Sequence, residues 1–185
     1  MTKCLISFGA NIPGPFGSPA DTLNHALQEF HLESLLIEKK SSFYSSLSFP
    51  DIQKPKYING CLQISVNCEA DDVLVRLKSI EKRMGRQQEY RWASRICDLD
   101  LLSFGNKVAP TPEIFNYWYK MQLKNQILKK PNQLLLPHPR IQDRAFVLKP
   151  LLEFAASWTH PVLHLTVTEM FNFLPEEQRA SVVLI

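Results

Sequence analysis

Two aspartates separated by a single residue, Asp98 and Asp100, have the type and spacing most directly suited to chemistry. If residues 95–104 form a strand, both carboxylates project from one face, about 7 Å apart along the chain. Two carboxylates at this spacing can hold one or two Mg²⁺ ions, which also bridge phosphate oxygens. The motif is short, and on its own a solvated strand face is the commoner explanation.

Three arginines lie just upstream of this pair, at Arg86, Arg91 and Arg95. The guanidinium fork matches phosphate oxygens and stabilises charge on a phosphoryl group in transfer. A solubilising loop is the alternative, but the aspartates that follow favour polyphosphate binding. Residues 85–92 are polar and lack apolar anchors. This composition suggests a mobile lid that would exclude water.

Two further groups of residues could contact substrates. Tyr57 and Asn59 share one face of a predicted strand, where they could sandwich and hydrogen-bond a flat heterocycle, although a sheet face covered by a helix is the alternative. His138 lies between two prolines, in a stiff extended stretch from which it could reach phosphate or serve as a plain loop residue. The sequence contains neither a P-loop nor a glycine-rich kinase loop, so neither would cradle ATP here.

The elements that must position these side chains follow from hydrophobic periodicity. We expect strands over 3–8, 35–44, 57–66 and 95–104. We expect helices from Ser18 onward and over 69–84, 112–130, 145–156 and 167–173. The order strand, helix, strand, strand, helix, strand is that of the ferredoxin-like unit. It predicts an α+β fold with a largely antiparallel sheet.

Composition limits the remaining classes. The chain has 185 residues, 45% of them hydrophobic and 21% charged, which fits one globular domain over 1–185. The net charge of +3 is too small to indicate nucleic acid by itself. The four cysteines form no C-x-x-C pair, which argues against zinc and for reduced thiols in a cytoplasmic protein. No apolar run approaches the ~18 residues of a membrane span.

Taken together, these residues resemble the 6-hydroxymethyl-7,8-dihydropterin pyrophosphokinase family, from about residue 3 to about residue 158. The most specific block is R-W-x-x-R-x-x-D-L-D at 91–100. The other matching blocks, in chain order, are Phe8-Gly9-Ala10-Asn11, Ser41-Ser42-Phe43-Tyr44, Tyr57-Ile58-Asn59, Ile80-Glu81 with Gly85-Arg86, Phe104-Gly105-Asn106, Pro137-His138-Pro139-Arg140 and Arg144-Ala145-Phe146.

The resemblance implies a three-layer αβα sandwich with helices on both faces of the sheet. It implies transfer of the β,γ-diphosphate of ATP to the hydroxymethyl group of the pterin, giving AMP. Asp98 and Asp100 would bind two Mg²⁺ ions, and catalysis would rest on Arg86, Arg95 and these two aspartates. The residues implied for the pterin are Tyr57, Asn59, Trp92 and Phe146. The residues implied for ATP are Glu81, Arg86, Arg95, His138 and Arg144.

The chain also departs from the family pattern. Ala93-Ser94 replaces Gly-Pro, Gln88 replaces a second loop arginine, and Ala145 replaces a glycine. The loop 46–49 lacks the usual Thr-Pro character of the pterin loop. The chain between Val108 and His138 is longer than in short members, so we expect an inserted helix near 112–130. It could pack on the domain or cover the nucleotide.

Two other classes of protein could use some of these residues. A nucleotide- or RNA-binding ferredoxin-like module would bind through the basic stretch 76–95, but it needs stacking aromatics, and Asp98 and Asp100 would repel a nucleic-acid backbone. A D-x-D glycosyltransferase would need a larger chain. The expected partners are therefore ATP and the pterin, with no nucleic acid and no membrane.

Overall fold

The computed structural model describes residues 1–86, 93–122, 125, 128–129 and 131–185. These residues form a six-stranded sheet in the order β5-β1-β4-β3-β6, with β2 also paired to β4. The strands are β1 (Thr2–Ala10), β2 (Leu36–Lys40), β3 (Tyr44–Ser46), β4 (Tyr57–Val66), β5 (Asp98–Phe104) and β6 (Val183–Leu184). Every pairing among them is antiparallel, as predicted.

The register of the central strand β1 brings distant polar residues into one row. Gly9 lies opposite Asn59 of β4 on one side and opposite Asp98 of β5 on the other. Adjacent strands are about 4.8 Å apart, so Asn59 and Asp98 lie about 10 Å apart across the glycine. An added Cβ on Gly9 would come within 3.0 Å of the Asn59 side-chain oxygen. Glycine therefore keeps the space between the two polar residues open.

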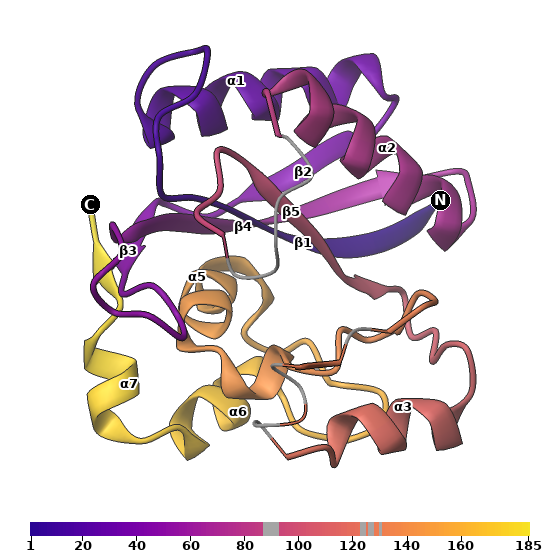
Figure 1. Cartoon of the computed structure of the whole chain (residues 1–185). Coiled ribbons are helices and arrows are strands. Elements are labelled where there is room, and N and C mark those ends of the chain that lie inside the picture. The colour runs from indigo at the N-terminus through magenta and orange to yellow at the C-terminus, as the bar shows by residue number, and fades with distance from the viewer. Residues whose placement is uncertain (87–92, 123–124, 126–127, 130) are drawn as a thin grey trace.

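Helices cover both faces of the sheet (Figure 1). One face carries α1 (Pro19–Leu32) and α2 (Ala70–Arg83), and the other carries α5 (Ala145–Ala155) and α6 (Val167–Phe173). The remaining described helices are α3 (Pro112–Tyr119), the short 3-10 helix η1 (Ile141–Asp143) and α7 (Glu176–Ala180). The α+β prediction with helices on both faces is confirmed. Among the described residues, no helix has the length and apolar character needed to cross a membrane.

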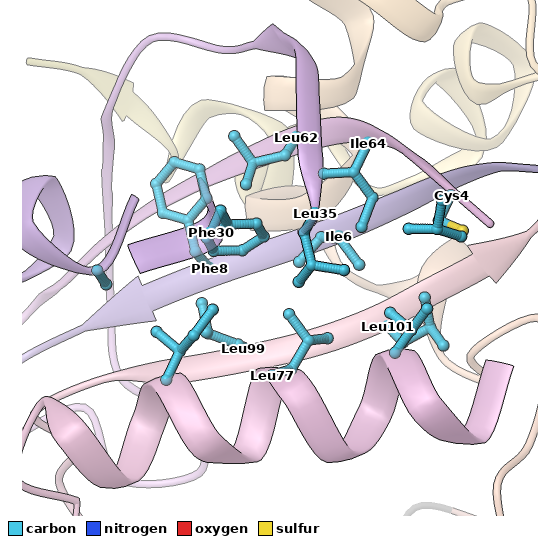
Figure 2. Close-up of a cluster of buried hydrophobic side chains, with 14 of the residues drawn as sticks. Cys4, Ile6, Phe8, Phe30, Leu35, Leu62, Ile64, Leu77, Leu99 and Leu101 are labelled. Carbon is cyan, nitrogen blue, oxygen red and sulfur yellow. The ribbon is translucent and has the colours of Figure 1, made fainter. Parts of the chain in front are cut away.

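An apolar core fills the space between the sheet and the helices α1 and α2. Figure 2 shows Phe8 and Leu99 from the sheet meeting Phe30 of α1 and Leu77 of α2. Successive side chains of a strand point to opposite faces of the sheet, so Asp98 and Asp100 face the opposite side from Leu99. The predicted orientation of the two aspartates is therefore correct.

Local signals explain where the helices begin and end. Ser18 caps α1, accepting a hydrogen bond from the Asp21 backbone N–H, while the Asp21 carboxylate accepts one from the Ser18 N–H. After α2, Gly85 adopts a φ of 91°, a conformation that side chains with a Cβ disfavour. The chain thus turns from α2 directly toward Arg86 and the site.

Some boundaries differ from those that periodicity predicts. The strand expected over 35–44 is instead two strands, because the Ser41 hydroxyl accepts the hydrogen bond of the Cys61 N–H and interrupts the ladder. The inserted helix starts as expected at Pro112 but α3 ends at Tyr119, and part of the predicted range to 130 lies outside the described residues. The short elements η1, α7 and β6 were not predicted.

A buried histidine between α5 and α6 links stability to pH. The side chain of His160 is fully buried, and its Nδ1 accepts hydrogen bonds from the backbone N–H groups of Val162 and Leu163. Nε2 therefore carries the proton, and it has no partner among the described residues. Burial, and secondarily the charge of His164, lowers the pKa of His160 to about 4. The folded protein thus resists protonation of this ring.

Acidification should therefore destabilise the protein through His160. The unfolded histidine titrates near 6.5, so stability is complete above that pH and is lost as the pH falls from about 6.5 to about 4. We expect a loss of about 2 kcal/mol in the free energy of unfolding between pH 7 and pH 5, measured by urea denaturation. In His160→Asn, whose amide oxygen can replace Nδ1 as acceptor, this loss should shrink. An unchanged pH dependence would assign it to other groups.

Candidate active site

A cleft of about 960 Å³ lies on the sheet face that carries α5 and α6. It brings together most of the side chains that the sequence singled out. Those that line it are Tyr57, Asn59, Arg95, Asp98, Asp100, His138, Arg144 and Phe146. Trp92 lies outside the described residues. Neither Glu81 nor Arg86 is among the lining residues, but Arg86 contacts Asp98 of the lining and is 25% exposed, whereas Glu81 is buried.

The two aspartates form the floor of the cleft, with arginines around them. Arg86 Nη1 lies 2.9 Å from Asp98 Oδ1, and Arg95 donates to the same oxygen. Arg144 Nη1 lies 3.5 Å from Asp100 Oδ2. Burial opposes the charge of the Arg95 guanidinium, but the negative charges of Asp98 and Asp100 outweigh burial and raise its pKa. Three permanent cations thus face two carboxylates.

Glu81, at the end of α2, joins this cluster from behind. Its side chain is only 2% exposed, and it pairs with Arg86 and with Lys78, whose Nζ lies 2.9 Å away. It also accepts a 2.8 Å hydrogen bond from the Leu99 backbone N–H. Burial raises the pKa of Glu81, while the charge of Lys78 acts against the rise. Three protein groups thus contact this carboxylate.

Aromatic and amide groups line the part of the cleft over β4. Asn59 is buried, and its Nδ2 donates to the Ser46 hydroxyl at 2.9 Å. Phe146 lies beneath the Arg144 guanidinium, 5.6 Å from ring centroid to Cζ. Burial, then the charge of Asp98, raises the pKa of Tyr57, so its phenol stays protonated. Two rings and a fixed amide thus flank the region next to the carboxylates.

The segment that follows the inserted helix runs along the outer edge of β5. The His138 N–H donates to the Leu102 carbonyl at 2.8 Å, and the His138 Nδ1 accepts from the Arg140 N–H at 3.2 Å. Burial, and then the charges of Arg144 and Arg140, lowers the pKa of His138 well below its usual value. A neutral ring whose Nδ1 accepts must carry its proton on Nε2. His138 can therefore donate a hydrogen bond at neutral pH.

Asn11 is a site residue that the sequence did not identify as one. Its Oδ1 accepts from the Arg95 N–H at 2.7 Å, and its Nδ2 donates to the Pro55 carbonyl at 3.1 Å and to the Ser48 hydroxyl at 3.3 Å. Ser94 Oγ lies 3.4 Å from the same nitrogen. One buried amide thus ties the loop before β4 to the segment before β5. Its place in the Phe8-to-Asn11 block was the available signal.

Removing the Asn11 amide should loosen both segments together. Asn11→Ala removes the acceptor of the Arg95 N–H and one of the two side-chain donors to the Pro55 carbonyl, and losing a hydrogen bond typically costs about 1 kcal/mol. We expect amide hydrogen exchange to accelerate in residues 46–56 and in 93–95, measured by mass spectrometry on the folded protein. The exposed Asn24 on α1 offers a matched control, Asn24→Ala, that should change neither segment. Acceleration in only one segment would show that Asn11 does not couple them.

Residues near the C-terminus also line the cleft, and the sequence did not indicate this. Leu165, Met170, Leu174 and Val182 contribute apolar surface, and β6 adds an edge strand to β3. Their spacing predicts only a short helix near 167–173. No local pattern shows that a tail folds back against a distant loop, because that depends on tertiary packing.

The donor set fits a particular kind of metal binding. Among the described residues, no three or more of the usual metal-ligating side chains gather in one place. The described residues therefore do not form a closed zinc site. Two carboxylates on one strand instead suit Mg²⁺, which is held by one or two carboxylates together with waters and substrate phosphates.

Fold and site together define an α+β enzyme whose cleft joins paired carboxylates, arginines and aromatic rings. Residues 5–156 match the family model of 7,8-dihydro-6-hydroxymethylpterin-pyrophosphokinase (HPPK). The chain therefore belongs to the HPPK family, the ATP-using pyrophosphokinases of folate biosynthesis.

Individual relatives agree with the family match. The chain is 32% identical over 169 residues to the 2-amino-4-hydroxy-6-hydroxymethyldihydropteridine pyrophosphokinase of Synechocystis sp., covering 91% of this chain and 74% of that protein. The enzyme of the same name from Pseudomonas aeruginosa is 28% identical, with 84% and 82% covered. A solved Plasmodium falciparum HPPK-DHPS chain shares the fold with a TM-score of 0.65 at 15% identity. The match covers 92% of this chain and 44% of that one.

Proposed function

We propose that this cleft transfers the β,γ-diphosphate of ATP to the hydroxymethyl group of 6-hydroxymethyl-7,8-dihydropterin. The pterin hydroxyl oxygen would form a bond to the β-phosphorus, and the bond to the oxygen that bridges the α and β phosphates would break. AMP and the pterin diphosphate are the products, and the hydroxyl proton is released. No covalent enzyme intermediate is needed, because positioning and charge neutralisation can supply the rate enhancement.

The carboxylates and arginines would handle the polyphosphate. Asp98 and Asp100 would hold two Mg²⁺ ions, which supply charge neutralisation at the phosphate oxygens when bound. Arg86 and Arg95 would release Asp98 and contact the phosphates that carry the growing negative charge. Arg144 and the Nε2–H of His138 would contact ATP phosphates from the outer edge of β5. This assignment is supported by the arginines that contact Asp98 and Asp100 on the floor of the cleft.

The region over β4 would hold the pterin. Tyr57 and Phe146 both line the cleft, and two rings facing a flat heterocycle gain stacking and burial. Asn59 would read the edge of the pterin through its amide, which the Ser46 hydroxyl orients. Trp92, outside the described residues, remains the fourth proposed pterin contact. Glu81 was expected beside ATP, but its burial behind the lining leads us to omit it from the nucleotide contacts.

The observation that carries this proposal is the pair Asp98 and Asp100, surrounded by arginines within one cleft that also holds two aromatic rings. The test is product analysis on the purified protein with ATP and Mg²⁺, with and without the pterin. We expect AMP to form only when the pterin is present and the pterin diphosphate to form in equal amount. Formation of ADP, or of AMP without pterin, would overturn the proposed reaction.

Two broader features belong to the same proposal. Residues 1–185 would form one pyrophosphokinase domain, which is supported by the packing of residues after 156 on α5 and their place in the cleft lining. A cytoplasmic location fits the four free thiols. ATP and the pterin are the partners we propose, with neither nucleic acid nor membrane.

A further inference from the structure

Glu81 is a buried acidic residue that the proposed reaction does not use directly. It lies in the last turn of α2, packed against the edge strand β5. Burying a carboxylate is unfavourable unless charged or hydrogen-bonding partners compensate. The partners of Glu81 therefore indicate why a carboxylate is buried at this position.

One oxygen of Glu81 serves two groups of the site at once. Oε1 accepts the hydrogen bond of the Leu99 N–H at 2.8 Å and also pairs with Arg86 Nη1. The same Arg86 nitrogen lies 2.9 Å from Asp98 Oδ1. Leu99 is the residue between the two aspartates, and its N–H points to the outer edge of β5, where no strand of the described residues pairs with it. Glu81 thus contacts both the Leu99 N–H, which lies between the two aspartates, and Arg86, which pairs with Asp98.

The second oxygen of Glu81 faces a more solvated group. Oε2 lies 2.9 Å from Lys78 Nζ, and the Lys78 side chain is half exposed. With Oε1 engaged twice and Oε2 engaged once, the carboxylate has little capacity left for a nucleotide hydroxyl or amine. The side chain also lies outside the lining of the cleft.

We propose that Glu81 is a positioning residue that acts through Arg86 and the Leu99 peptide rather than by touching ATP. This inference rests on the proposed function, because it assigns a role within that reaction. Glu81 fixes Arg86 at a defined distance from the aspartates and fixes the separation of the two carboxylates along β5. Removing a residue that orients another site residue in this way typically lowers activity about 10- to 100-fold.

The first test separates positioning from nucleotide contact. Glu81→Gln keeps an acceptor for the Leu99 N–H but removes the charge that holds Arg86. We expect kcat to fall about 10-fold or more, and the affinities for ATP and for inorganic tripolyphosphate, each with Mg²⁺, to change by the same factor. Loss of ATP affinity with unchanged tripolyphosphate affinity would show contact with the nucleoside and overturn the proposal.

A second test asks whether the effect passes through Arg86. In an Arg86→Gln background, Glu81→Gln should lower kcat by no more than about 2-fold, because the shared interaction is already gone. Fully independent, multiplicative effects of the two changes would contradict the proposal. The control is Glu29→Gln, which removes a similar carboxylate–arginine pair, with Arg83. Neither residue is among those that line the cleft, so this change should leave kcat unchanged.

A further variant separates a folding defect from the loss of positioning by Glu81. If Glu81→Gln does not fold, Glu81→Asp retains the charge but is one methylene too short to reach both partners. In that variant we expect faster amide hydrogen exchange at Leu99 together with lower kcat. Unchanged exchange and kcat would overturn the proposal. If the wild type forms no pterin-dependent AMP, the proposed function fails, whereas the tripolyphosphate comparison and the Leu99 exchange still test the role of Glu81 in the site.

Discussion

Asp98→Asn is expected to lower kcat by about 10³-fold or more while the protein remains folded. The carboxylate is the proposed ligand for Mg²⁺ and lies on the floor of the cleft. An amide oxygen is a weaker ligand for a hard cation, and it removes the negative charge that Arg86 and Arg95 share. Measuring pterin-dependent AMP formation at saturating ATP checks the loss, and thermal unfolding checks the fold.

A nearby carboxylate gives the matched control for this change. Asp143 also lines the cleft, but the ion pair that its carboxylate makes there is with Arg140, whose Nε lies 2.7 Å from Oδ2. Asp143→Asn removes the same charge from the same cleft and should lower kcat by less than about 10-fold, because its exposed ion pair contributes little. Equal losses in the two variants would mean that net charge, rather than a metal ligand, matters at Asp98.

Gly60→Ala is expected to lower the free energy of unfolding by about 2–3 kcal/mol. An added Cβ at this position would lie 2.2 Å from Cζ of Phe8, far inside van der Waals contact. The Phe8 ring cannot simply move, because it is buried and packs edge-on against Phe43 at 5.7 Å. The strain must therefore spread through the core beneath α1 and α2.

A second substitution, at Phe8, tests whether its ring causes the loss of stability in Gly60→Ala. In a Phe8→Leu background the ring is absent, so the further loss caused by Gly60→Ala should shrink to about 1 kcal/mol or less. Urea denaturation of the four proteins in this cycle gives the coupling energy. The same loss in both backgrounds would assign the effect to the backbone of β4 instead of to the ring of Phe8.

Much of this fold could be predicted because its signals are local. Residues 57–66 alternate clearly and form β4 with the predicted limits, and α2 runs from a capped start to a glycine stop. The alternation around Leu99 correctly placed both aspartates on one face. The division of 35–44 escaped prediction because a serine hydroxyl replaces a ladder partner, which only the paired strand reveals.

The site was partly predictable for a similar reason. Charged residues close in sequence, such as Arg95 and Asp98, stay close in space. Asn11, by contrast, contacts residues 37 to 84 positions away in the chain, so no local spacing could show its role. The tail after 156 lines the cleft through packing alone. The hydrogen bond between Glu81 and the Leu99 N–H likewise required the structure, because α2 and β5 meet only in the folded protein.

The sharing of one oxygen at Asp98 has a thermodynamic consequence. A cation that binds at Oδ1 would displace the ion pairs that Arg86 and Arg95 make with that oxygen. Free Mg²⁺ leaves the displaced guanidinium groups without an anion, whereas Mg²⁺ that arrives with ATP brings phosphates to receive them. The two ligands should therefore show positive coupling, and by linkage each raises the affinity for the other by the same factor. We therefore expect these ion pairs to favour binding of the metal–nucleotide complex over binding of either component alone.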